Sequence, residues 1–212
     1  MKALLFDMDG VIVDSEPMHT AVTLELLSSY DIHLTLNDLD RFAGTTMHYI
    51  FSTMKQEHHL ASTPERLIQQ QLDRILDIVL HEPQKMIDGI PEILSFLKEK
   101  QIPTAIASSS PKKLVKAVVD RLGITNSFEF LLSGEDVTHS KPAPEIYLLA
   151  AKHLGIAPKD CVVIEDSKNG TIAAKDAGMF CIGFKNLHSG DQDLSRADVI
   201  VPTLVGLDMN KF

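Results

Sequence analysis

Two acidic residues follow the first apolar run of the chain. In Phe6-Asp7-Met8-Asp9-Gly10-Val11, the carboxylates of Asp7 and Asp9 lie two residues apart, directly after Ala3–Phe6. Carboxylates this close repel each other unless a cation or a proton lies between them. A divalent ion that prefers oxygen ligands, such as Mg²⁺, would relieve the repulsion. A polar turn after a strand also produces such a pair, so this motif alone leaves both interpretations open.

A second acidic pair follows another apolar run far along the chain. Glu165 and Asp166 come directly after Cys161–Ile164. In a parallel sheet the carboxyl ends of the strands meet at one edge, so the acids of both motifs would converge there. Crowded or buried carboxylates are costly unless they are paired or bound to metal. The two pairs together therefore favour a metal site.

A row of serines follows a third apolar run. Ser108, Ser109 and Ser110 come after Thr104–Ala107 and directly before Pro111. Hydroxyls and free backbone amides at the start of a helix bind anions. Serine before proline is also an ordinary helix start, and we expect Ser110 to serve as the N-cap.

Lys141 is the remaining candidate for anion binding. It lies between Ser140 and Pro142 in a short proline-rich stretch. An ammonium group on such a restrained segment could hold a phosphoryl oxygen as a point charge. A solvent-exposed loop lysine is the alternative.

The elements that must position these residues alternate along most of the chain. Six apolar runs predict buried parallel strands: Ala3–Phe6, Thr104–Ala107, Phe128–Leu132, Cys161–Ile164, Phe180–Phe184 and Val199–Val201. Prolines and glycines mark the first positions and the ends of the helices between them: Pro91, Pro111 and Pro144, then Gly123, Gly155 and Gly178. From about residue 87 onward this alternation predicts a doubly wound α/β fold.

Residues 15–82 break the alternation and show helical patterns only. One helix is expected over Pro17–Ser29, and another begins after Thr63. Apolar residues then recur at helical spacing: Ile68, Leu72, Ile75 and Val79. We therefore expect an α/β core domain of residues 1–14 and 83–212, with a helical domain of residues 15–82 inserted after the first strand. Ligands of open α/β sheets bind at that end of the strands.

The overall composition excludes several classes of protein. The 212 residues include 20 basic and 29 acidic ones, a net charge of −9, which argues against partners that are nucleic acids or anionic membranes. No apolar stretch reaches the about 18 residues of a membrane span. Cys161 and Cys181 lie in apolar runs and are expected to be buried thiols. We expect a soluble cytoplasmic protein, either a monomer or a weak homo-oligomer.

In their order along the chain, these motifs resemble those of the haloacid dehalogenase superfamily. The chain is similar in particular to the subgroup of β-phosphoglucomutase and small sugar-phosphate phosphatases. The resemblance covers the chain from end to end and rests on four motifs: Asp7-Met8-Asp9-Gly10-Val11 with Asp14-Ser15, Ser108, Lys141-Pro142 and Glu165-Asp166-Ser167. It implies a Rossmann-like core, an α-helical cap domain over residues 15–82, and phosphoryl transfer as the chemistry.

The resemblance also implies a role for each matching residue. Asp7 would attack phosphorus and form an aspartyl-phosphate, and Asp9 would be the general acid and base. Mg²⁺ would be held by Asp7, the Asp9 carbonyl oxygen and Asp166, with Glu165 a ligand or a close neighbour. The phosphoryl oxygens would be bound by Ser108, Ser109 and Lys141.

The cap region separates a phosphatase from a mutase. His19 matches a histidine of the mutase. However, Met47 stands about where the mutase has an arginine for a second phosphate, and Gln69-Gln70-Gln71 stand where another basic residue is expected. Without these cations, water would reach the aspartyl-phosphate. The candidate contacts to substrate in this region are His19, Thr45, Thr46 and His48.

We therefore expect a Mg²⁺-dependent phosphatase that acts on a small phosphorylated metabolite, with a sugar phosphate as the expected substrate. A phosphosugar mutase is the first alternative. A weakly catalytic binding or regulatory protein on the same scaffold is the second.

Overall fold

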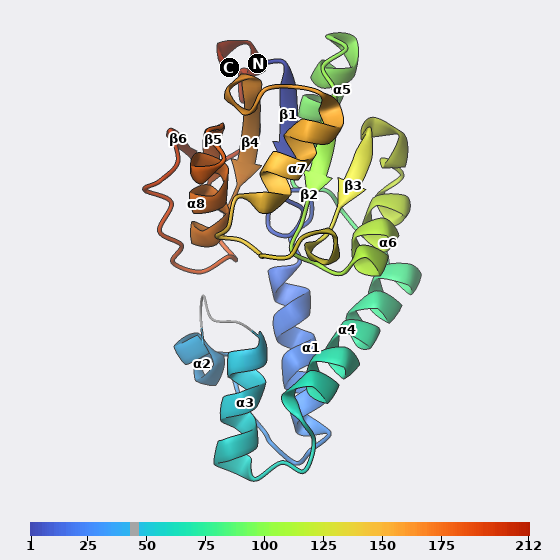
Figure 1. The fold of residues 1–212 in the computed structure, drawn as a ribbon. Helices are drawn as coiled ribbons and strands as arrows, with labels where there is room; N and C mark the ends of the chain where they lie inside the picture. Colours follow the sequence, from blue (N-terminus) through green and yellow to red (C-terminus); the bar gives the residue numbers. More distant parts are fainter. Residues whose placement is uncertain (43–46) are drawn as a thin grey trace. The chain divides into compact units, whose positions relative to one another are not determined.

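The computed structural model describes residues 1–42 and 47–212 (Figure 1). These residues form two compact units: residues 1–14 with 83–212, and residues 15–82. Each unit has a hydrophobic cluster of its own.

The first unit is built on a six-stranded sheet in which every strand pair is parallel, in the order β3-β2-β1-β4-β5-β6. The strands are β1 (Ala3–Phe6), β2 (Thr104–Ala107), β3 (Phe130–Leu132), β4 (Cys161–Glu165), β5 (Phe180–Phe184) and β6 (Val199–Val201). This topology confirms the predicted doubly wound α/β fold. Strand β3 begins later than predicted, at Phe130, because Phe128 ends a 3₁₀ turn, and its ring packs edge-on against Phe6.

The candidate site lies where the strand order reverses. Strand β1 lies between β2 and β4, and Phe6 pairs with Ile106 on one side and with Ile164 on the other. The backbone N–H of Asp7 continues this ladder by donating to the Ile164 carbonyl oxygen at 3.1 Å. The residues that follow β1, β2 and β4 therefore leave the sheet at the same edge. This reversal is where open α/β sheets bind ligands.

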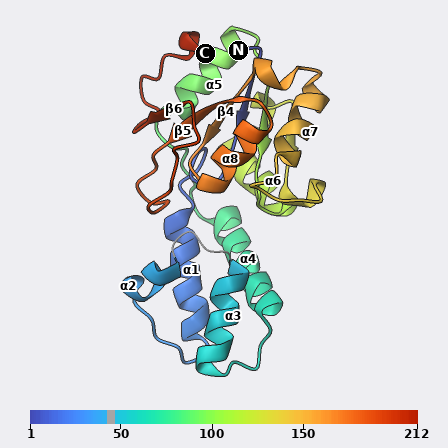
Figure 2. The same cartoon turned by 60° about the vertical axis from the view of Figure 1, so that its left-hand side comes forward.

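Four longer helices accompany the sheet: α5 (Ile90–Glu99), α6 (Lys112–Leu122), α7 (Glu145–Leu154) and α8 (Lys168–Asp176). Short 3₁₀ turns occupy Thr125–Ser127, Gly134–Asp136, Pro158–Asp160 and Met209–Lys211. Helices α7 and α8 lie together on one face of the sheet (Figures 1 and 2) and share an alanine-rich hydrophobic cluster with it. Connections between parallel strands are right-handed, and this rule places α5 and α6, which connect β1 to β2 and β2 to β3, on the other face of the sheet.

The caps of these helices correct part of the sequence interpretation. Gly123 and Gly155 end α6 and α7 in the left-handed conformation, as predicted. The prediction that Ser110 is the N-cap of α6 is wrong. Pro111 takes that position, and the Ser110 hydroxyl bonds to a carboxylate of the candidate site instead.

Helices are the regular secondary structure of the second unit's described residues. The unit contains α1 (Glu16–Ser28), the short α2 (Leu36–Leu39) with a 3₁₀ turn at Asp40–Phe42, α3 (Met47–His58) and α4 (Pro64–His81). Helix α4 packs against both α1 and α3 (Figure 2). Thr63 caps α4 as predicted, because its hydroxyl accepts a hydrogen bond from the Arg66 N–H. No described helix of either unit is long and apolar enough to cross a membrane.

Candidate active site

Lys141 forms a buried ion pair with two carboxylates from neighbouring strands. Its Nζ lies 2.5 Å from Asp7 Oδ1 and 2.6 Å from Glu165 Oε1. The Lys141 side chain is only 5% exposed. These carboxylates hold the pKa of the ammonium above its ordinary value, although burial acts in the opposite direction. The three sequence motifs therefore meet at one buried point, and the lysine is a charged member of the site.

Helix α7 fixes the segment that delivers Lys141. Glu145, its first residue, accepts hydrogen bonds from the backbone N–H groups of Thr138 and His139 at 2.8 and 2.9 Å. The His139 ring lies at 3.1 Å from the same carboxylate. The Lys141–Pro142 peptide bond is cis. Sequence reasoning missed Glu145, because an acid in a first helical turn is ordinarily read as a partner of the helix dipole.

Glu165 accepts four hydrogen bonds. Its Oε1 accepts from Lys141 Nζ and from the Tyr147 hydroxyl, the latter at 2.8 Å. Its Oε2 accepts from the N–H and the hydroxyl of Ser167, at 3.1 and 2.9 Å. A carboxylate offers about four lone-pair sites, so this geometry uses all of them. Glu165 is thus the hydrogen-bonded partner of Lys141, and it lies beside Asp7 and Asp166.

A glycine makes room for this carboxylate. A Cβ atom built on Gly170 would lie 1.7 Å from Glu165 Oε1. Gly170 belongs to the first turn of α8, whose N-cap Ser167 accepts from the Gly170 N–H. Tyr147 and Gly170 were both missed by sequence reasoning, because an aromatic residue in a helix and a helical glycine carry no signal of a contact to Glu165.

The carboxylates of Asp7, Glu165 and Asp166 form a buried cluster whose oxygen atoms lie within 4.8 Å of one another. Burial raises the pKa of Asp7 well above its ordinary value, and the Glu165 and Asp166 charges add to this, although Lys141 opposes it. Burial, followed by the Glu165 charge, raises the pKa of Asp166 to about 7. Carboxylate oxygens such as those of Asp7 and Asp166 are the ligands that a hard divalent cation prefers, and Glu165 lies beside them. The described residues could therefore hold one.

Asp9 is bound by the serines that follow β2. The Ser110 hydroxyl donates to Asp9 Oδ2 at 2.7 Å, and the Ser108 hydroxyl does so at 3.4 Å. Ser108 is buried and also accepts from the Ser110 N–H at 3.0 Å. Ser109, by contrast, is exposed, and its carbonyl oxygen lies against Gly134. The side chains of Ser108 and Ser110 thus contact Asp9, whereas the side chain of Ser109 is exposed.

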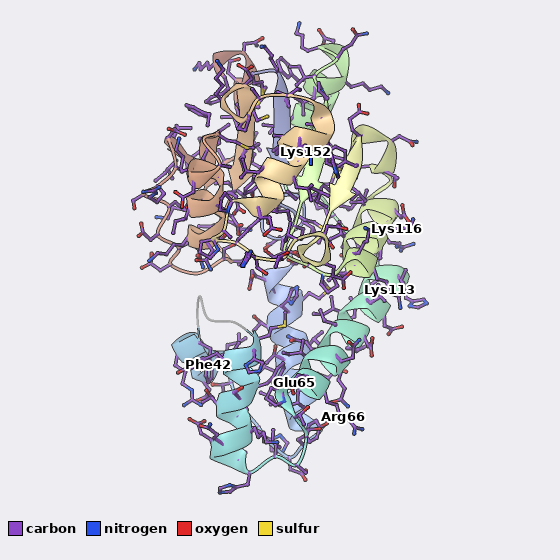
Figure 3. All side chains as sticks on the ribbon, viewed as in Figure 1. Phe42, Glu65, Arg66, Lys113, Lys116 and Lys152 are labelled. Atoms are coloured by element: carbon purple, nitrogen blue, oxygen red, sulfur yellow. The ribbon has the colours of Figure 1, made fainter. Side chains whose placement is uncertain are left out.

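Two candidate substrate residues, His19 and His48, lie on described helices of the helical unit. His19 lies half-buried on α1, and the exposed His48 on α3 lies 3.3 Å from Glu65 of α4 (labelled in Figure 3). Thr45 and Thr46 lie outside the described residues. Gln71 is buried and donates to Thr23 Oγ1 at 2.7 Å. Gln71 therefore packs inside the helical unit and does not present its amide to solvent.

Comparisons with known proteins agree with this geometry. Residues 4–184 match the family described as haloacid dehalogenase-like hydrolase. The chain is 32% identical to the Phosphorylated carbohydrates phosphatase of Thermotoga maritima, over 84% of this chain and 82% of the relative. It is 30% identical to the Beta-phosphoglucomutase of Bacillus subtilis, over 95% of this chain and 89% of the relative. The solved structure of CbbY from Rhodobacter sphaeroides with xylulose-(1,5)bisphosphate shares the fold, with a TM-score of 0.85, 23% identity, and coverage of 98% of this chain and 96% of that chain.

Proposed function

Because this chain belongs to the haloacid dehalogenase-like hydrolase family, we propose that it is a Mg²⁺-dependent phosphatase of a small phosphorylated sugar. The observation that carries the proposal is the buried group of Asp7, Lys141 and Asp166 at the carboxyl ends of β1 and β4. An ammonium paired with a nucleophilic carboxylate, beside a cation site, suits in-line phosphoryl transfer. The phosphatase name of the Thermotoga maritima relative supports a sugar phosphate as substrate.

Asp7 is the proposed nucleophile. Its carboxylate oxygen attacks phosphorus, the bond from phosphorus to the sugar oxygen breaks, and an aspartyl-phosphate forms. Lys141 Nζ lies against Asp7 Oδ1. The ammonium charge is therefore next to the nucleophile, where it would bind a phosphoryl oxygen on which negative charge develops. When bound by Asp7, the Asp9 carbonyl oxygen and Asp166, Mg²⁺ would supply further neutralisation of the phosphoryl charge.

Asp9 is the proposed general acid and base. It would protonate the departing sugar oxygen and then remove a proton from the water that attacks the aspartyl-phosphate. The hydroxyls of Ser108 and Ser110 orient its Oδ2. When a phosphate group is bound, Ser108, Ser109 and Lys141 would contact its oxygens. His19, Thr45, Thr46 and His48 are the proposed substrate contacts of the helical unit.

Phosphate release tests the function. Wild type with Mg²⁺ should release inorganic phosphate from members of a panel of hexose, hexitol and pentose phosphates. Asp7→Asn, which keeps the shape and removes the nucleophile, should abolish release. Asp73→Asn, a matched change on the exposed surface of α4, should leave it unchanged. No release by wild type above Asp7→Asn would instead support a binding protein on this scaffold.

A mutase remains the alternative, favoured by the identity to the Bacillus subtilis mutase. It predicts that β-glucose 1-phosphate, with a trace of the 1,6-bisphosphate, is converted to glucose 6-phosphate faster than phosphate is released. We expect the opposite order, since Met47 supplies no charge for a second phosphate. A faster isomerisation would replace the phosphatase assignment.

A further inference from the structure

A loop after β5, residues 186–192, contacts the acidic cluster from outside the four sequence motifs. The Ser189 hydroxyl donates to Asp166 Oδ2. Asp166 is 5% exposed, and this hydrogen bond sets the rotation of its carboxylate. The direction in which the other oxygen, Oδ1, points is thereby set as well. Ser189 thus acts on a carboxylate that could hold a cation.

Gly10 leaves the space that this hydrogen bond occupies. A Cβ atom on Gly10 would lie 2.0 Å from Asp166 Oδ2 and 3.0 Å from Ser189 Oγ. Gly10 has a φ of +77°, a backbone conformation that residues with a side chain rarely adopt. The Ser189–Asp166 pair therefore packs directly on the backbone that follows Asp9.

Two amide side chains anchor the loop. Asn186, which is buried, donates to the Gly10 carbonyl oxygen at 3.0 Å and accepts from the His188 N–H at 2.9 Å. Gln192 donates to the Ser189 carbonyl oxygen at 2.9 Å and accepts from the N–H of Lys168, the first residue of α8, at 3.1 Å. The loop is thus tied both to the segment after Asp9 and to the segment after Asp166. Ser189 has little freedom to leave its partner.

We propose that Ser189 is a positioning residue of the candidate metal site: by holding Oδ2 of Asp166, it would orient the carboxylate so that its other oxygen can bind the cation. The inference rests on the proposed function only in its use of a divalent cation. Outer partners that orient metal ligands change metal affinity by about 10- to 100-fold when they are removed. A hydroxyl that merely filled space would have no such effect.

The experiment measures Mg²⁺ binding to the full chain by titration calorimetry without substrate. Ser189→Ala should raise the Kd for Mg²⁺ about tenfold or more, whereas Ser189→Thr, which keeps the donor, should stay within about twofold of wild type. Ser195→Ala is the matched control, because Ser195 is an exposed serine just beyond the loop, and its N–H bonds to Asp193. In phosphate-release assays, Ser189→Ala should raise the Mg²⁺ concentration for half activity more than it lowers kcat at saturating Mg²⁺.

Mg²⁺ affinity of Ser189→Ala within about twofold of wild type would overturn the inference, as would a wild type that binds no Mg²⁺. Circular dichroism establishes that the variant is folded. If it is not, Ser189→Cys, which keeps the volume and weakens the donor, takes its place with the same expectation. A wild type that binds Mg²⁺ with this dependence on Ser189 but hydrolyses no phosphomonoester would remove the phosphatase and leave the inference intact.

Discussion

The Tyr147 hydroxyl and the Lys141 ammonium donate to the same oxygen, Oε1 of Glu165. Tyr147 is fully buried on α7, and Lys141 Nζ lies 4.9 Å from the centre of its ring. Burial, followed by the charges of Glu165 and Asp7, raises the pKa of this phenol well above its ordinary value, so the hydroxyl remains a donor. A helix that belongs to no motif thus holds the lysine and the glutamate together.

Tyr147→Phe should lower the free energy of unfolding by about 1.5–3 kcal/mol, because a buried carboxylate loses a hydrogen bond from a neutral donor. Urea unfolding provides the measurement. Tyr30→Phe is the control, since the Tyr30 hydroxyl lies between the neutral groups of Ser62 and Gln70 in the helical unit, and its loss should cost about 1 kcal/mol. Equal losses in the two variants would show that the Glu165 charge plays no part.

Lys141→Met should destabilise the chain by about 3–5 kcal/mol, because it leaves Asp7 and Glu165 buried without their cation. Adding Asp7→Asn to this variant should restore part of the loss, since one of the two unpaired charges is then removed. Lys116→Met on α6 (Figure 3) serves as the control, because its ion pair with Asp120 is exposed and is worth less than about 1 kcal/mol. A loss that Asp7→Asn leaves unchanged would contradict the ion-pair explanation.

Gly170→Ala should reduce phosphate release by at least about 100-fold, because a misplacement of about 1 Å in an active site costs that much. The new methyl group would overlap the Glu165 carboxylate, and Glu165 could not then hold Lys141 in place. Gly123→Ala, where nothing lies within 4 Å of the added Cβ, tests the effect of an alanine alone. It should cost about 1–2 kcal/mol of backbone strain without loss of activity. Full activity in Gly170→Ala would show that Glu165 can relocate freely.

Mg²⁺ should stabilise the chain more at high pH than at low pH. In the metal-free protein the pKa of Asp166 is raised from 3.8 to about 7, so its folded form binds the proton more tightly than the unfolded chain does. Its contribution to stability is therefore complete below the unfolded pKa and is lost as the pH rises through about 7. Mg²⁺ binds the ionised form and offsets that loss.

The increase in Tm on adding MgCl₂, relative to NaCl of equal ionic strength, should thus be small at pH 5.5 and grow toward pH 8. Differential scanning fluorimetry across this range checks it. An increase that is independent of pH would place the bound ion away from Asp166.

The amino-acid sequence determined the chemical components and the fold class of this protein. Local hydrophobic patterns are enough to predict the strands, and in a parallel sheet the carboxyl ends of the strands meet at one edge. The sequence therefore predicts that the acids at these ends lie close together, namely Asp7, Asp9, Glu165 and Asp166. Tertiary structure decided what each side chain contacts. The Ser110 hydroxyl donates to Asp9 and does not cap α6. The Glu165 carboxylate accepts hydrogen bonds from Lys141, Tyr147 and Ser167. Such contacts join residues far apart in the chain, such as Ser189 and Gly10 beside Asp166, and only the packed core brings them within hydrogen-bonding distance.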